Sequence, residues 1–279
     1  MEQKNHAMPN VEMSSQFFDR ICVIDHAGEH SFMELLQTSA RVASGLLNKE
    51  KDLEESRVCF LTQPEFDYVA IQWGIWRAGG IAVPLCTSHP LAEIEYSIND
   101  ADAKIIVYQS EFEEFLQPLN NETHGRKFIS TPELLRSPTS ILPKIKENRR
   151  AMILYTSGTT NKPKGVVTTH ANIRSQITSL VKAWEWNEND HILHVLPLHH
   201  VHGIVNILCC ALWSGAKCEI LQKFDPAVVW NRFIEKALTL FMAVPTIYNR
   251  LISNWEEVNE KEQSRRSEAC KKFRLMVSG

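Results

Sequence analysis

Short apolar stretches alternate with longer amphipathic stretches along most of the first half of the chain. Apolar runs of strand type lie at 20–25, 57–61, 81–84 and 104–108. Apolar residues at helical spacing lie between them, at 31–47, 64–77 and 90–99. The first of these helices has Ser31 as a plausible N-cap, with Glu34 three residues on. Strands that alternate with helices in this order favour βαβ units and a parallel sheet.

The same alternation resumes after residue 150. Strands are predicted at 151–154, 190–196, 217–221, 240–244 and 273–277, and helices at 171–184, 203–213, 225–236 and 245–255. Between 120 and 150, prolines and mixed charge show no clear period, which predicts irregular structure and a subdomain seam. We therefore expect an α/β fold of two βα-layered subdomains with largely parallel sheets.

Composition narrows the class of protein. The chain has 279 residues, a formal net charge of −3, 44% hydrophobic residues and 23% charged residues, which is ordinary for a globular protein. The near-neutral charge argues against nucleic acid as a partner, and no apolar stretch is long enough for a transmembrane segment. Seven irregularly spaced cysteines without a Cys-x-x-Cys pair predict free thiols in a reducing compartment.

The most distinctive chemistry follows the strand at 151–154. The run at 155–165 reads Tyr-Thr-Ser-Gly-Thr-Thr-Asn-Lys-Pro-Lys-Gly, and its glycines, hydroxyls and lysines suit a polyphosphate. It is not a Walker A loop, because a strand-like Val166-Val167 follows Gly165 in place of a helix. An ordinary Gly/Thr-rich hairpin loop is the alternative. The candidate phosphate-binding residues are Thr156, Ser157, Gly158, Thr159, Thr160, Lys162, Lys164 and Gly165.

The full string resembles the signature of the adenylate-forming (AMP-binding) superfamily, which includes acyl-CoA synthetases, luciferases and peptide-synthetase adenylation domains. The usual signature has glycine where this chain has Asn161. The resemblance begins near Phe17 and reaches Gly279. It implies a tail at 1–16 and, at 17–279, part of the large N-terminal domain of an acyl-CoA synthetase. A predicted strand at the end of the chain leaves a sheet edge uncovered, so we expect an N-terminal portion of a longer protein.

A second constellation is Leu-Pro-Leu-His-His-Val-His-Gly at 196–203. Three histidines in four residues raise the possibility of a metal site. Their spacing does not match a helical His-x-x-x-His pair, and no cysteine or carboxylate is close in sequence, so no metal ligand is assigned. Polar residues at a strand end are the plain alternative. Acyl-CoA synthetases carry Leu-Pro-x-x-His at the acyl pocket, and the resemblance places His200 in that pocket and His202 at its wall.

The third match is Phe-Met-Ala-Val-Pro-Thr-Ile-Tyr-Asn-Arg-Leu at 241–251, where the superfamily usually has Gly-Val-Pro-Thr. Together with the histidine run and the last six residues, it resembles malonyl–CoA synthetases. That subfamily pairs a basic residue near this turn with the free carboxylate of malonate, which implies this role for Arg250. Bidentate hydrogen bonding suits an arginine to the task. From the residues alone, a solvated surface arginine is the alternative.

The resemblance implies an ATP-dependent acid–CoA ligase. Malonate would attack ATP to give an acyl-adenylate and pyrophosphate, and coenzyme A would then displace AMP. ATP and Mg²⁺ are the implied cofactors, and the partners are small molecules. The superfamily's Tyr-Gly-x-Thr-Glu motif, with its Mg²⁺ ligand, and its C-terminal lysine do not occur in the sequence. We therefore assign no catalytic residue and expect the chain to be inactive alone.

Other activities remain open at this stage. The alternatives are a medium-chain acyl or aryl–CoA ligase, and a non-catalytic fragment that binds nucleotide or acyl substrate. The resemblance implies a mitochondrial location, with the cytoplasm as the alternative. The N-terminus, however, lacks both the apolar core of a secretory signal and the arginines of a transit peptide.

Overall fold

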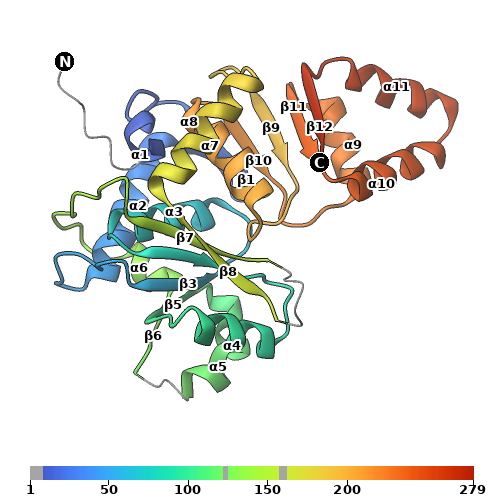
Figure 1. The fold of residues 1–279 in the computed structure, drawn as a ribbon. Coiled ribbons are helices and arrows are strands. Elements are labelled where there is room, and N and C mark those ends of the chain that lie inside the picture. The colour runs from blue at the N-terminus through green and yellow to red at the C-terminus, as the bar shows by residue number, and fades with distance from the viewer. Residues whose placement is uncertain (1–8, 122–124, 157–161) are drawn as a thin grey trace.

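A computed structural model describes residues 9–121, 125–156 and 162–279 of the chain. Two six-stranded sheets form its framework (Figure 1). The first sheet has the order β12-β11-β9-β10-β1-β2, and the second has the order β6-β5-β3-β4-β7-β8. The pairs β1–β2 and β7–β8 are antiparallel and the other neighbours are parallel, so the predicted α/β class with largely parallel sheets is confirmed.

The strands are short, as expected for buried parallel sheets. They are β1 Ile21–Asp25, β2 Gly28–Ser31, β3 Arg57–Leu61, β4 Ile81–Pro84, β5 Ile105–Tyr108, β6 Lys127–Ser130, β7 Arg150–Thr156, β8 Lys164–Thr169, β9 His191–His194, β10 Lys217–Ile220, β11 Leu240–Ala243 and β12 Leu275–Ser278.

The α-helices are α1 Pro9–Ser14, α2 Phe32–Leu47, α3 Phe66–Arg77, α4 Leu91–Asp100, α5 Glu113–Asn121, α6 Thr131–Leu135, α7 His170–Ala183, α8 Cys210–Trp213, α9 Pro226–Glu235, α10 Pro245–Glu256 and α11 Glu260–Cys270. A 3₁₀ turn spans Ser110–Phe112 and a π-helix spans His202–Cys209.

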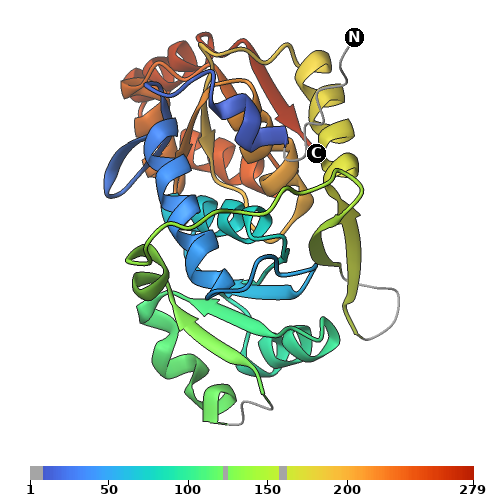
Figure 2. The same cartoon turned by 90° about the vertical axis from the view of Figure 1, so that its left-hand side faces the viewer.

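The helices and sheets stack in five layers. Helices α2 and α3 lie between the two sheets, and the largest apolar cluster joins them to strands of both (Figures 1 and 2). Helices α4 and α5 cover the outer face of the second sheet, and α9, α10 and α11 cover the outer face of the first. Inner strands such as β3, β4 and β11 are therefore buried on both faces, which explains why they read as continuous apolar runs.

Several local predictions are confirmed by the backbone. Ser31 caps α2, and its hydroxyl accepts a hydrogen bond from the Glu34 amide at 3.1 Å. The apolar segment predicted as a helix at 203–213 is helical, although most of it adopts the π form. No helix among the described residues is long and apolar enough to cross a membrane.

The prediction of irregular structure at 120–150 is wrong in part. Strand β6 pairs in parallel with β5 at the edge of the second sheet, and α6 follows it directly. The sheet does not change in this region, because β7 and β8 join the same sheet. A four-residue edge strand with only Phe128 and Ile129 as apolar members gives too weak a pattern to recognise. The tail predicted at 1–16 also contains α1.

Candidate functional site

The predicted phosphate loop connects the two strands of an antiparallel hairpin. Tyr155 pairs with Gly165 and Thr156 pairs with Lys164 at the end where β7 and β8 meet the loop. Thr156, Lys162, Lys164 and Gly165 are exposed there. The candidates Ser157, Gly158, Thr159 and Thr160, and Asn161 beside them, lie outside the described residues.

Close packing in the hairpin explains why residue 165 is a glycine. A Cβ atom on Gly165 would lie 2.9 Å from the Cγ2 atom of Ile153, too close for an ordinary contact. The hairpin therefore needs glycine at this position because its two strands approach closely, and this requirement is independent of any ligand.

Helix α4 holds the end of the hairpin. The Tyr155 hydroxyl donates to the Asp100 carboxylate at 2.9 Å and also lies 3.1 Å from the Ser97 carbonyl oxygen. Burial and the hydrogen bond to Asp100 raise the pKa of Tyr155 well above its ordinary value, so the hydroxyl keeps its proton. Tyr96 contacts the residue just before β8, since its hydroxyl donates to the Pro163 carbonyl at 2.9 Å.

Lys162 also contacts this helix. Its ammonium group lies 5.6 Å from the centroid of the Tyr96 ring, within the range of a cation–π contact. The helix thus contacts both the strand that enters the loop and the chain that leaves it.

A histidine just before the histidine run has a structural role. His194 is buried at the end of β9, where its Nε2 lies 3.0 Å from the Gly203 carbonyl and its Nδ1 accepts from the Leu196 amide at 3.2 Å. Burial lowers the pKa of His194 to about 4, so the ring is neutral near pH 7. A Cβ atom on Gly203 would lie 2.5 Å from the Pro197 carbonyl oxygen, which makes glycine necessary at this turn.

A cavity of about 260 Å³ joins the hairpin to the histidine run. Tyr155 and Thr156 line it from the hairpin, and His199 and His200 line it from the turn after β9. The rings of His199 and His200 lie with their centroids 4.1 Å apart. Partial burial, together with the neighbouring His199 and His89 rings, lowers the pKa of His200. Thr156 and His200 are 44 positions apart in the sequence, and the fold brings them to one cavity.

His202 and Arg250 lie apart from this cavity, and neither is among its described lining residues. His202 is half-buried at the start of the π-helix, and its Cε1 atom lies 4.0 Å from the position that a Cβ on Gly279 would occupy. Arg250 is exposed on α10, with its guanidinium carbon 4.7 Å from the centroid of the Phe224 ring. The structure therefore brings His200 to the hairpin, whereas it does not bring the three predicted acyl-pocket residues into one described cavity.

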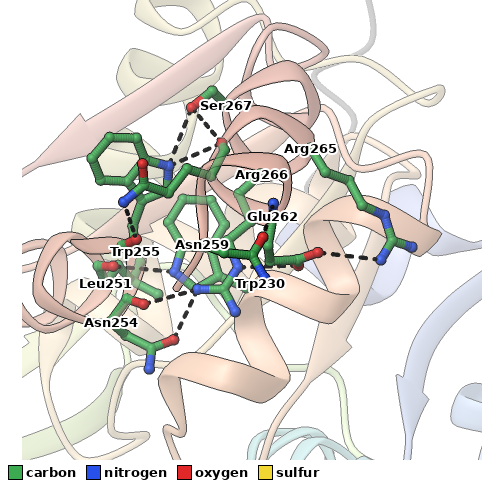
Figure 3. Close-up of polar contacts among 10 residues, drawn as sticks. Trp230, Leu251, Asn254, Trp255, Asn259, Glu262, Arg265, Arg266 and Ser267 are labelled. Atoms are coloured by element: carbon green, nitrogen blue, oxygen red, sulfur yellow. Dashed lines mark hydrogen bonds and ion pairs between the residues drawn. The ribbon is translucent and has the colours of Figure 1, made fainter. Parts of the chain in front are cut away.

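The helix that carries Arg250 is anchored beyond that residue (Figure 3). The Trp230 indole donates to the Leu251 carbonyl at 3.1 Å. Arg266 of α11 donates to the Asn254 carbonyl at 3.0 Å, and its guanidinium carbon lies 5.4 Å from the centroid of the Trp230 ring. These contacts hold α10, the helix that carries Arg250, against α9 and α11.

Sequence reasoning did not single out four residues beside the candidate site. Tyr96 and Asp100 anchor the hairpin, and Cys86 and His89 line the cavity next to His199. The sequence held only part of the signal for the first pair, because Tyr96 lies on the helix predicted at 90–99, whereas Asp100 lies one residue beyond it. No such signal exists for Cys86 and His89, which follow β4 and meet His199 only through the fold.

Comparison with known proteins identifies the relatives of this arrangement. The family of AMP-binding enzymes matches residues 12–279. The mitochondrial malonate–CoA ligase ACSF3 of Homo sapiens is 38% identical over 299 residues, which cover 99% of this chain and 51% of that protein. The Mus musculus protein of the same name is 41% identical over 279 residues, with 94% and 48% covered. The chain spans about half the length of these relatives.

Solved structures of related proteins superpose on most of this chain. ATP-bound MatB from Rhodopseudomonas palustris superposes with a TM-score of 0.83 at 27% identity, covering 98% of this chain and 55% of that one. The inhibitor-bound N-terminal domain of FACL13 from Mycobacterium tuberculosis has a TM-score of 0.85 at 21% identity, covering 98% and 70%. The second likeness concerns the fold alone.

Proposed function

The chain belongs to the AMP-binding enzyme family, and we propose that it carries the ATP- and acid-binding part of a malonate–CoA ligase. The observation that supports this most is the shared cavity. Thr156, at the end of the predicted phosphate loop, and His200, in the predicted acyl pocket, line it together. A ligase must hold ATP and its acid side by side, because the two react with each other. The names of the human and mouse relatives supply malonate as the acid.

The proposed reaction has two steps. A malonate carboxylate attacks the α-phosphorus of ATP, the bond to the β-phosphate oxygen breaks, and pyrophosphate leaves. The thiol of coenzyme A then attacks the acyl carbon and AMP leaves. In the first step, Lys164 and the Thr156 hydroxyl would stabilise the negative charge of the phosphates, and His200 would line the acid side of the cavity.

Malonate poses a second requirement, because one of its carboxylates stays free while the other reacts. We assign Arg250 to that carboxylate. Its guanidinium is exposed, its charge has no acidic partner among the described ion pairs, and its stem is supported by Phe224. A guanidinium can bind a carboxylate through two parallel hydrogen bonds. Residues outside this chain's described cavity would have to complete the enclosure around the acid.

The described residues that line the cavity are poorly suited to binding Mg²⁺. Mg²⁺ prefers oxygen ligands in octahedral geometry. Glu93 is the one carboxylate among the described cavity-lining residues, and it already lies 3.2 Å from His89 Nδ1. Among the described residues that line this cavity, no second carboxylate is present to complete an oxygen-ligand set for Mg²⁺.

Titration of the chain with ATP tests the proposal. Isothermal titration calorimetry should show saturable binding that Lys164→Ala weakens at least about tenfold, the scale of losing one charge-assisted contact. Lys182→Ala is the matched control, because Lys182 is exposed in the last turn of α7. Equal ATP affinity of the Lys164→Ala and Lys182→Ala variants would contradict the proposal.

Location is proposed from the relatives alone. The human and mouse proteins are named as mitochondrial, which supports a mitochondrial site of action for this protein. Import of the radiolabelled chain into isolated mitochondria, with protection from added protease, is the expected result. Full protease sensitivity after incubation would argue against it.

A further inference from the structure

Three side chains with metal-binding atoms meet on the wall of the cavity. Cys86 and His89 come from the segment after β4, and His199 comes from the turn after β9. One ligand atom from each of the three lies within 4.8 Å of the other two. The two segments follow strands of different sheets, β4 and β9, so the tertiary fold brings the three side chains together.

The chemistry of the three side chains points to a particular class of ion. A thiolate and two imidazoles are the ligands that Zn²⁺ and similar ions prefer, whereas Mg²⁺ and Ca²⁺ prefer oxygen. Cys86 is buried, and His89 and His199 are half-buried.

The surroundings match those of a metal-binding histidine. The Glu93 carboxylate lies 3.2 Å from Nδ1 of His89, one helical turn away. Carboxylates in this position orient metal-binding imidazoles and raise their basicity. The centroid of the His200 ring lies 4.1 Å from that of the His199 ring, so the two rings are in contact. Three protein ligands would leave one coordination position free for water or a small molecule.

We propose that Cys86, His89 and His199 form a binding site for a thiophilic divalent metal ion of the Zn²⁺ class. The site lies on the wall of the cavity that Thr156 and His200 share. This inference goes beyond the proposed ligase activity and does not depend on it, because metal binding can be measured without ATP or malonate.

Titration of the full chain with Co²⁺ under reducing conditions tests the site. Co²⁺ bound to a thiolate gives a charge-transfer absorption in the near ultraviolet, and Zn²⁺ should displace it. Cys86→Ser should abolish the band, and His199→Asn should weaken Co²⁺ binding at least about tenfold. Cys270→Ser is the matched control, since Cys270 is a free, partly buried cysteine on α11.

Thermal unfolding provides a second readout. Zn²⁺ should raise the Tm of the wild-type chain and of Cys270→Ser, and leave that of Cys86→Ser unchanged. Should Cys86→Ser fail to fold, His199→Asn carries the same comparison, because its ring is only half-buried. Absence of the band in the wild-type chain, or a band of equal strength in Cys86→Ser or His199→Asn, would overturn the proposal.

Discussion

Replacing Arg250 with alanine should weaken malonate binding while leaving the fold almost unchanged. The residue is exposed on α10, and its described contact is with the ring of Phe224 at 4.7 Å. A cation–π contact at an exposed site contributes about 0.5–1 kcal/mol. The free energy of unfolding should therefore fall by no more than about 1 kcal/mol in Arg250→Ala.

The expected cost to malonate binding is larger. Hydrogen bonds to a charged group contribute about 1.5–3 kcal/mol, which corresponds to roughly a 10- to 150-fold change in Kd. Unpairing a fully buried charge costs about 3–5 kcal/mol, but the exposure of Arg250 places the expected effect below that range. Arg250→Ala should therefore lose more free energy of malonate binding than free energy of unfolding.

The assay is calorimetric titration of the ATP-loaded chain with malonate and, in parallel, with acetate. Arg250→Lys keeps the charge but loses the two-pronged geometry, so its malonate affinity should fall between those of wild type and Arg250→Ala. Arg265→Ala is the control, because Arg265 is an exposed arginine on the adjacent helix α11. The reasoning is refuted if Arg250→Ala binds malonate as wild type does, or loses acetate affinity to the same extent.

Three further predictions concern stability and the hairpin. Gly203→Ala should lower the free energy of unfolding by about 1–3 kcal/mol in urea, because the new Cβ would lie 2.5 Å from the Pro197 carbonyl oxygen. Burial would raise the pKa of Asp190, but hydrogen bonds, led by Arg274, outweigh it and hold that pKa below its ordinary value. The stability from this pair is complete above about pH 4 and is lost as pH falls through the folded-state pKa; urea titrations of Asp190→Asn should lack this acid loss. Tyr155→Phe removes the hydrogen bonds to α4 and should weaken ATP binding with little change in unfolding, as calorimetry and urea denaturation would show.

The fold was largely predictable because its inner strands are buried on both faces and read as short apolar runs. The strands β3, β4 and β5 were recognisable in this way. The strand β6 and the helix α11 were missed for the opposite reason: β6 lies at a sheet edge, and α11 is highly charged with few apolar positions. Local periodicity reports burial, so elements with little buried surface give little signal.

The candidate site was predictable only where a motif is continuous in sequence. The hairpin and the histidine run could each be recognised, yet their meeting in one cavity depends on how two sheets pack. The proximity of Cys86 and His89 to His199 was hidden for the same reason, and the sequence assigned no metal ligand. The exposure of Arg250 on α10 likewise follows from the packing of that helix against α9 and α11.

A crystal structure of the chain with ATP and malonate would test the central claim most directly. The account predicts the ATP phosphates at the end of the β7–β8 hairpin, within hydrogen-bonding distance of Thr156 and Lys164. It also predicts a malonate carboxylate on the Arg250 guanidinium, with the acid reaching toward His200. ATP bound away from the hairpin, or malonate bound without contact to Arg250, would contradict the account.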